Sequence, residues 1–304
     1  MKQYGKLLTT ALVAAALIIG VICLKNYCSC RLPNEDMGVR SVVARGHIDT
    51  LFVGSSAYRK GINMYRVSEE LPGESFMLTY NGNQPFNVAI ELKEIIGSGA
   101  DVDLIVADFN PSMVDRGADL SDKRLLWDIS MEGKRKLWSE LKNREGADLF
   151  TWFDYWVSSN MDYMATYPIA KPMISKRYYL GGSADTEESA GKTAEELASL
   201  EIVENPGIND LQRSSIDEII KLCSENDIKL IFLECPRYVL MADNENYRAK
   251  SDELAAYIEE KGIEVLRDVN LGFDNTNPGY YADLTHMSGE GSKVLTDIII
   301  GKLK

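Results

Sequence analysis

The sequence predicts an α/β protein in which a mostly parallel sheet lies between two layers of helices, a three-layer α/β/α arrangement. Two observations predict it. Short apolar runs that end at turn residues alternate with helical patterns, which is typical of βαβ units. In addition, the 304 residues are 45% hydrophobic and 26% charged, so the chain can bury a large core. This composition excludes a disordered, collagen-like or many-pass membrane protein.

The charge of the chain is strongly acidic, with a formal net charge of −13. Such a chain repels phosphate polymers unless a basic face is segregated, so we expect no nucleic-acid partner. The basic charge is concentrated at the N-terminus. Residues 1–31 hold four basic and no acidic residues, which leaves −17 on residues 32–304. We therefore divide the chain into an N-terminal membrane anchor, 1–31, and an α/β domain, 32–304.

Residues 7–24 form an uncharged and almost wholly apolar stretch. A helix that crosses a bilayer needs about 17–25 such residues. A cleaved signal peptide is the competing interpretation, but no Ala-x-Ala-like site follows Leu24. We predict an uncleaved single-pass anchor, a transmembrane helix in the cell membrane. The α-amine, Lys2 and Lys6 outweigh the two basic residues after the stretch, which favours a cytoplasmic N-terminus and an extracytoplasmic body.

The elements of the domain are predicted from apolar periodicity and from turn residues. The run from Ile48 to Val53, for example, is apolar and stops at Gly54, as expected of a buried strand. The predicted strands are 48–53, 75–80, 102–107, 228–233 and 263–266, and the predicted helices are 86–96, 216–223, 252–260 and 291–303. Functional sites of such sheets form at the carboxyl ends of the strands.

The alternation fails over residues 112–207, where we predict a mainly helical insertion. All four tryptophans lie here, at positions 127, 138, 152 and 156. These aromatic residues could line an acyl or glycan groove or lie against a membrane. They could also form the core of a helical subdomain, which we favour because they are widely spread. Near its end we interpret Gly181-Gly182-Ser183 as a hinge and the acidic segment 185–196 as a mobile tail.

The first polar cluster follows the first predicted strand, where residues 54–57 read GSSA. A buried strand that runs into a glycine and two serines puts a hydroxyl at a sharp turn above the sheet edge. The N–H of Ser56 can then contribute to an oxyanion site. Taken alone, this pattern is more often a plain turn or a helix cap.

The second polar cluster lies just before the last predicted helix, where residues 283–286 read DLTH. An aspartate three residues before a histidine can accept the Nδ1–H of the imidazole and so orient it. Nε2 is then free to take a proton from a serine. In the alternative interpretation, Asp283 or Thr285 caps a helix and His286 lies on the surface.

Together the two clusters resemble the SGNH (GDSL-type) hydrolase superfamily. That family carries its nucleophile in a Gly-Asp-Ser-like block after the first strand and its base in an Asp-x-x-His block near the C-terminus. The resemblance implies an SGNH/flavodoxin-like sheet, with Ser56 as nucleophile, His286 as base and Asp283 as the residue that orients it. Ser55 stands where the family has aspartate, which removes a carboxylate that often supports the turn.

The resemblance also implies an oxyanion hole. The glycine of the family's second block corresponds to Gly82, and the asparagine of its third block corresponds to Asn110. With the N–H of Ser56, these groups would stabilise a tetrahedral oxyanion, and no metal or cofactor is implied. The third block departs from the family, because the fuller Gly-x-Asn-Asp pattern is absent here.

Residues 54–63 read GSSAYRKGIN. This is similar to the opening of membrane-anchored SGNH-like proteins of bacterial envelopes, including those that move D-alanyl or acetyl esters on wall and lipoteichoic polymers. The resemblance implies a serine acyl esterase or O-acyltransferase that acts on ester groups of envelope carbohydrate or polyol polymers. The implied partners are an envelope glycan or teichoic-acid-like polymer and a membrane-bound O-acyltransferase. The alternative is a catalytically inactive SGNH-like scaffold that binds such an acyltransferase or polymer.

Other candidates for chemistry are weaker. We interpret His47 as structural, because no Cys or carboxylate stands at ligand spacing from it, and two distant histidines predict no metal site. The acidic run 187–196 is typical of a solvated helix face. Cys235 is interpreted as a small buried residue before a turn and not as a reactive thiol. The pairing or acylation of Cys28 and Cys30 stays open.

Overall fold

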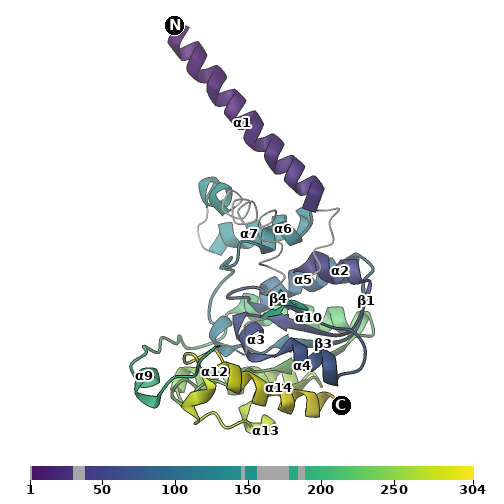
Figure 1. Ribbon diagram of the computed structural model, residues 1–304, viewed down its shortest axis with the longest axis vertical. Coiled ribbons are helices and arrows are strands. Elements are labelled where there is room, and N and C mark those ends of the chain that lie inside the picture. The colour runs from purple at the N-terminus through teal and green to yellow at the C-terminus, as the bar shows by residue number, and fades with distance from the viewer. Residues whose placement is uncertain (1, 30–37, 145–147, 156–177, 184–188) are drawn as a thin grey trace.

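The computed structural model describes residues 2–29, 38–144, 148–155, 178–183 and 189–304 (Figure 1). Cys30, Trp156 and the acidic residues Glu187 and Glu188, which the sequence analysis singled out, lie outside this part of the chain.

The centre of the fold is a five-stranded sheet in the order β2-β1-β3-β6-β7, and every pairing in it is parallel. This confirms the predicted parallel sheet, and each of its strands lies within one residue of the predicted bounds. The strands are β1 (His47–Gly54), β2 (Ser75–Thr79), β3 (Asp101–Asp108), β6 (Lys229–Leu233) and β7 (Glu264–Leu266).

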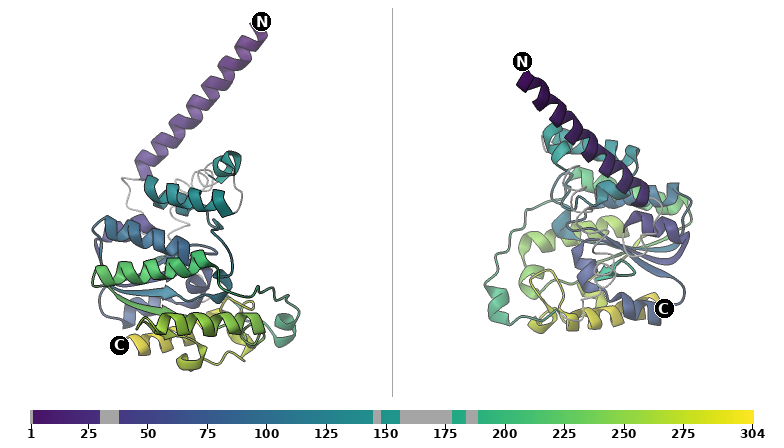
Figure 2. Two further views of the ribbon diagram at one scale, coloured as in Figure 1. Left: turned by 180° about the vertical axis from the view of Figure 1, so that it is seen from behind. Right: turned by 45° about the horizontal axis from the view of Figure 1, so that its top comes forward.

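Helices cover both faces of the sheet, as predicted for three layers (Figures 1 and 2). Alternate residues of each strand point to opposite faces. Leu51 and Val53 of β1 therefore join one core, and Phe52 joins the other. The first core lies under α2 (Val39–Arg45), α5 (Pro85–Gly97) and α10 (Asp210–Glu225), and the second under α3 (Ser56–Gly61), α4 (Met64–Glu70) and α14 (Gly289–Leu303).

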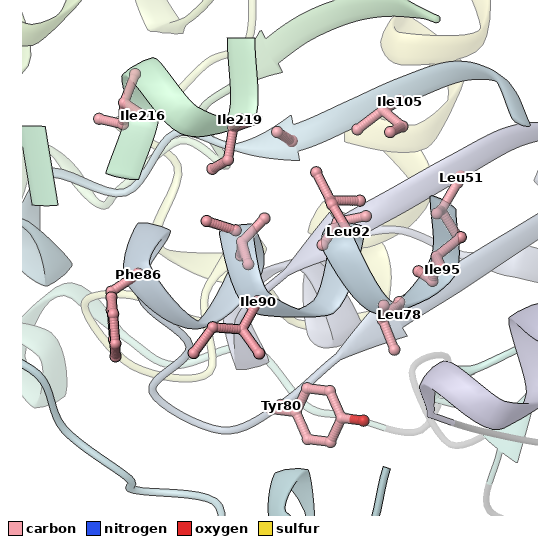
Figure 3. Packing of buried hydrophobic residues seen from close by; sticks show 14 of the residues in the cluster. Leu51, Leu78, Tyr80, Phe86, Ile90, Leu92, Ile95, Ile105, Ile216 and Ile219 are labelled. Carbon is pink, nitrogen blue, oxygen red and sulfur yellow. The ribbon is translucent and has the colours of Figure 1, made fainter. Parts of the chain in front are cut away.

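Figure 3 shows how the first core is filled. Leu92 and Ile95 of α5 lie beside Leu51 of β1, while Ile216 and Ile219 of α10 lie near the start of α5. At the far edge of the sheet, α12 (Glu245–Glu259) contacts β7.

Side-chain caps set where several helices begin. Asn244 accepts hydrogen bonds from the N–H groups of Asn246 and Tyr247, and α12 therefore begins at Glu245, seven residues before the predicted start. The first two turns of α12 are mostly polar, so apolar periodicity did not reveal them. Ser288 caps α14 in the same way, immediately after the predicted His286 cluster.

The described part of the predicted insertion contains α6 (Leu125–Asp128), α7 (Met131–Arg144), a helix over residues 149–155 and α9 (Ala194–Ala198). The rings of Trp138 and Trp152 lie 5.2 Å apart, and Trp152 packs against the first core. These two tryptophans thus attach the 149–155 helix to α7 and to the body of the domain.

The segment interpreted as a hinge is a tight hairpin formed by β4 (Tyr178–Tyr179) and β5 (Gly182–Ser183). Both turn residues have positive φ, 47° at Leu180 and 80° at Gly181, which is the geometry of a type I′ turn. The N–H of Met77 donates to the Leu180 carbonyl at 2.8 Å. A Cβ at position 181 would lie 1.7 Å from the Met77 carbonyl oxygen, so the turn is packed against the edge strand β2.

The acidic segment 185–196 was predicted to be a mobile tail, and its described part is instead attached to the C-terminal loop. The N–H of Lys192 donates to the Tyr281 carbonyl at 2.9 Å, and the Ser189 carbonyl accepts from Gly289 N–H at 2.7 Å. Thr193 and Glu196 then form a capping box that starts α9. We call residues 189–193 the strap.

Ahead of the domain stands α1 (Lys2–Ser29), a long helix that points away from it (Figure 1). Its stretch Tyr4–Val21 has a mean hydropathy of 1.8 and is not buried against the rest of the structure. By length and composition this helix could act as a membrane anchor or as a signal sequence.

Candidate active site

The site lies where the strand order of the sheet reverses. From β1 the chain adds β2 on one side and then returns to add β3 on the other side. Loops diverge at the carboxyl ends of β1 and β3, which leaves room for a site between them. Ser55 and Ser56 follow β1 directly, and Asp108 is the last residue of β3.

The turn after β1 is tight. A Cβ at position 54 would lie 2.5 Å from the Cβ of Asp108, so only glycine fits there. Ser55 is the N-cap of α3, and its Oγ accepts from the N–H of Ala57 at 3.3 Å. Ser56 is the first residue of α3, where a backbone N–H has no acceptor within the helix. The turn thus presents both the Ser56 hydroxyl and its N–H at the sheet edge.

The loop that carries His286 is closed by its own backbone and by Asp283. An antiparallel bridge joins Tyr281 to Met287, and the N–H of Ala282 donates to the His286 carbonyl at 2.9 Å. Asp283 Oδ1 accepts from the N–H groups of Thr285 and His286, both at 2.8 Å. The aspartate therefore fixes the loop with one oxygen and leaves the other for the imidazole.

The structure brings Ser56, His286 and Asp283 together. Ser56 Oγ lies 2.9 Å from His286 Nε2, and His286 Nδ1 lies 2.8 Å from Asp283 Oδ2. All three side chains are partly exposed, so an ester from solvent can reach the hydroxyl. This is the hydrogen-bond order of a serine, a base and an orienting carboxylate.

The electrostatics favour an ionised Asp283. Burial acts to raise the pKa of this carboxyl, but the hydrogen bond and charge of His286, with two backbone N–H donors, outweigh burial and hold the pKa well below its usual range. An ionised Asp283 keeps the proton of the imidazole on Nδ1. Nε2 is then the nitrogen that faces Ser56 as an acceptor.

Asp108 supplies the carboxylate that Ser55 lacks. Its Oδ2 accepts from the N–H of Ser55 at 2.9 Å and from the Ser55 hydroxyl at 2.6 Å. Burial raises the pKa of Asp108, although the hydrogen bonds from Ser55 partly oppose this. The sequence analysis missed this residue. The available signal was its position, an aspartate at the carboxyl end of the strand that neighbours β1.

Arg237 is a second residue of the site that the sequence did not indicate. Its buried guanidinium donates to the Thr285 carbonyl at 2.5 Å and to Tyr247 Oη at 3.3 Å, while the N–H of Tyr238 donates to the Leu284 carbonyl. These contacts hold the His286 loop from the side of β6. No sequence pattern joins Arg237 to a residue 48 positions away.

The two further oxyanion candidates lie beside the turn that carries Ser56. Asn110 is buried, and its Nδ2 donates to Ser55 Oγ at 3.3 Å. Gly82 has a φ of 59° in the turn after β2, and Tyr80 of that turn donates its N–H to the Gly54 carbonyl at 3.2 Å. Asn110 thus contacts Ser55, and the turn that contains Gly82 contacts Gly54. The role of both residues as oxyanion donors stays a prediction.

The expectation that no carboxylate stands at ligand spacing from His47 is wrong, because aspartates surround its ring. Its Nδ1 lies 3.0 Å from Asp101 Oδ2, and the hydrogen bond that the ring donates to Asp101 raises the pKa of the imidazole. Asp49 and Asp103 lie nearby. The group is at the start of β1, the opposite end of the sheet from Ser56. Cys235 is buried, and burial raises the pKa of its thiol, which makes it an unreactive side chain.

No family model and no curated protein matches the sequence. Two crystal structures are similar in fold. One is a Bacteroides fragilis protein provisionally described as an acylhydrolase, with a TM-score of 0.42 and 13% identity over 90% of this chain and 97% of that chain. The other is a GDSL-like lipase of Bacteroides thetaiotaomicron, with a TM-score of 0.39 and 12% identity over 86% of this chain and 90% of that chain.

Proposed function

We propose that the protein is a serine acyl esterase or O-acyltransferase in which Ser56 is the nucleophile, His286 the base and Asp283 the residue that orients it. The observation that carries the proposal is the continuous hydrogen-bonded series from Ser56 Oγ to His286 Nε2 and from His286 Nδ1 to Asp283. A chance pair of surface residues does not produce both contacts with the correct nitrogen on each side.

The reaction proceeds in two steps. Ser56 Oγ attacks the carbonyl carbon of an ester, and His286 Nε2 takes the hydroxyl proton and then gives it to the departing alcohol. The N–H of Ser56, with Gly82 and Asn110, stabilises the tetrahedral oxyanion by about 3 kcal/mol per well-placed donor. Water then resolves the acyl-enzyme in an esterase, and a sugar or polyol hydroxyl resolves it in a transferase.

The proposed place of action is the cell envelope. The support is α1, whose apolar stretch is long enough to cross a bilayer and is preceded by basic residues. We propose that α1 stays attached as a single-pass anchor with a cytoplasmic N-terminus. The catalytic domain then meets ester groups on envelope glycans or teichoic-acid-like polymers, with a membrane-bound O-acyltransferase as a further partner.

Hydrolysis of p-nitrophenyl acetate by the full chain, together with labelling by a serine-directed phosphonate, tests the proposal. Ser56→Ala should lower kcat/KM by on the order of 10⁵-fold and abolish the label. Ser224→Ala, at an exposed serine of α10, is the matched control and should change neither. A label that persists in Ser56→Ala would defeat the assignment.

The same assay separates an enzyme from a scaffold. A chain that neither hydrolyses the ester nor takes the label would favour the catalytically inactive scaffold. Two departures from the family favour a scaffold, the serine at position 55 and the incomplete third block around Asn110. Asp108 supplies from β3 a carboxylate to the turn at position 55, which weakens the first of these reasons. Added glycerol separates the two enzymes, because a transferase converts it to an ester while an esterase releases only acid.

A further inference from the structure

A group of apolar side chains on α7 and the 149–155 helix remains exposed. The exposed fractions are 81% at Phe150, 73% at Leu149, 64% at Met131 and 60% at Phe153. With Trp138 and Arg135 these side chains line a hollow of about 720 Å³. We call these six residues the aromatic patch.

The aromatic patch differs from the rest of the surface of the domain. Elsewhere on the described domain, large apolar side chains are exposed at scattered positions, such as Leu240 and Val269. Single exposed apolar residues are normal in soluble proteins, whereas a contiguous exposed group marks a surface that binds something.

The helix α7, which forms one side of the patch, is basic, whereas the whole chain is acidic. The α7 sequence, MEGKRKLWSELKNR, has five basic and two acidic residues, although the whole chain carries −13. Lys136 is paired with Glu218, whereas Arg135 and Lys142 lie on the exposed side. The apolar residues Leu137 and Leu141 of α7 are buried in the first core, so the exposed side of this helix is its polar, basic side. Basic side chains beside exposed aromatic residues are typical of a surface that meets an anionic membrane interface.

The aromatic patch also lies at the end of the domain that is nearest to α1, the proposed membrane anchor. In both Figure 1 and Figure 2, α6 and α7 are at the end of the domain from which α1 departs. Lys123 contacts Asp154 and the ring of Tyr155, and Trp152 packs on the first core, so the 149–155 helix is attached to the domain while Leu149 and Phe150 stay exposed.

We propose that the aromatic patch binds the headgroup region of an anionic phospholipid membrane and seats the catalytic domain against it. Aromatic rings prefer this region, and the basic residues of α7 attract anionic lipid. The proposal uses the membrane attachment of the proposed function but is independent of the role of Ser56. In this proposal the catalytic domain is held at the membrane surface and does not move freely at the end of α1.

Tryptophan fluorescence tests the proposal directly, because all four tryptophans of the chain lie between positions 127 and 156. The full chain is reconstituted into vesicles of equal parts phosphatidylglycerol and phosphatidylcholine, with acyl chains brominated near the headgroup. Bromine quenches indole at contact, so we expect emission about twofold lower than in unbrominated vesicles. Added salt or pure phosphatidylcholine should restore most of the emission.

The double variant Leu149→Asp/Phe150→Asp should lose the quenching. Both positions are in the first turn of their helix, next to Asp148, where carboxylates favour the helix N-terminus and folding is therefore preserved. Val269→Asp is the matched control, because Val269 is also 73% exposed in the first turn of a helix, α13 (Asp268–Leu271), and should keep the quenching. All three proteins should hydrolyse a soluble ester equally.

Flotation of the chain with the vesicles measures membrane attachment through α1, and quenching measures contact between the aromatic patch and lipid. Failure of the proposed anchor can therefore be distinguished from failure of the proposed membrane contact of the patch. A chain that floats with the vesicles without quenching overturns the proposal, as does equal quenching in the double variant. Equal quenching in pure phosphatidylcholine overturns the anionic requirement. Self-association that the double variant abolishes, in the absence of quenching, would assign the patch to a second copy of the chain instead.

Discussion

The turn that carries Ser56 depends on a carboxylate from another strand. Asp108 Oδ2 accepts hydrogen bonds from both the N–H and the hydroxyl of Ser55, so one buried oxygen fixes the residue that precedes the proposed nucleophile. The side chain at position 55, the N-cap of α3, and the carboxylate at the end of β3 therefore together support a turn that one aspartate supports in the family that the sequence resembles. Support of the turn at residues 54–56 thus needs a carboxylate beside Ser55, whichever strand provides it.

Asp108→Ala should consequently lower kcat/KM for a soluble ester by on the order of 10²-fold, because the Ser56 hydroxyl loses its fixed position relative to His286. Asp103→Ala, an exposed aspartate of the same strand, is the control and should have little effect. Comparable losses in both variants would show that the effect is general damage to β3.

Single residues of the site could be predicted only where they form a local pattern. Asp283 and His286 stand three residues apart, and Ser56 follows a strand and a glycine, so sequence spacing was informative for these three. Asp108 and Arg237 act on partners that are far away in sequence, Ser55 and Thr285. Their roles follow from the sheet order and from the packing of β6, which no local pattern contains.

Among the elements, the strap has the clearest relation to the candidate site. It hydrogen bonds to Tyr281 and Gly289, which flank the His286 loop on both sides. At its centre, a Cβ on Gly191 would lie 2.0 Å from the Gly279 carbonyl oxygen. The strap and the loop therefore touch backbone to backbone, and glycine is needed for that approach.

Gly191→Ala should displace the strap from the His286 loop, lower kcat several-fold and lower the melting temperature by about 2 °C for each kcal/mol lost. Gly97→Ala is the matched control, since a Cβ there meets nothing within 4 Å. Full activity and unchanged hydrogen exchange of residues 281–289 in Gly191→Ala would show that the strap does not position the loop.

The elements of the sheet could be predicted because buried parallel strands are continuous apolar runs bounded by turn residues. The hairpin at Leu180 and the strap could not be predicted in this way. Their sequences are polar or rich in glycine, and what holds them is contact with Met77 and with Gly279, at distant positions. Such segments look mobile until the partner is known.

The stability of the whole molecule carries a pH dependence that originates in α5. Glu91 is fully buried there, and its carboxyl accepts from Asn83 Nδ2 at 3.0 Å. Burial raises the pKa of Glu91 from 4.5 to about 8. The folded chain thus holds a proton on Glu91 that the unfolded chain releases between these two values.

Because the folded state binds the extra proton in that window, this group makes folding less stable as the pH rises, by about 1 kcal/mol per pH unit. Glu91→Gln keeps a hydrogen-bond acceptor and removes the ionisable group. The variant should therefore gain stability relative to the wild type between about pH 5 and about pH 8 in urea denaturation. Glu259→Gln, at an exposed position of α12, should run parallel to the wild type. Parallel curves for Glu91→Gln as well would contradict the raised pKa.

Ser56 and His286, the proposed nucleophile and base, are 230 residues apart in the chain. During synthesis the serine emerges well before the imidazole that would activate it. A nascent or truncated polypeptide therefore has an ordinary, unreactive hydroxyl. Ester-cleaving ability would arise only after His286 has been made and its loop has met the turn that carries Ser56.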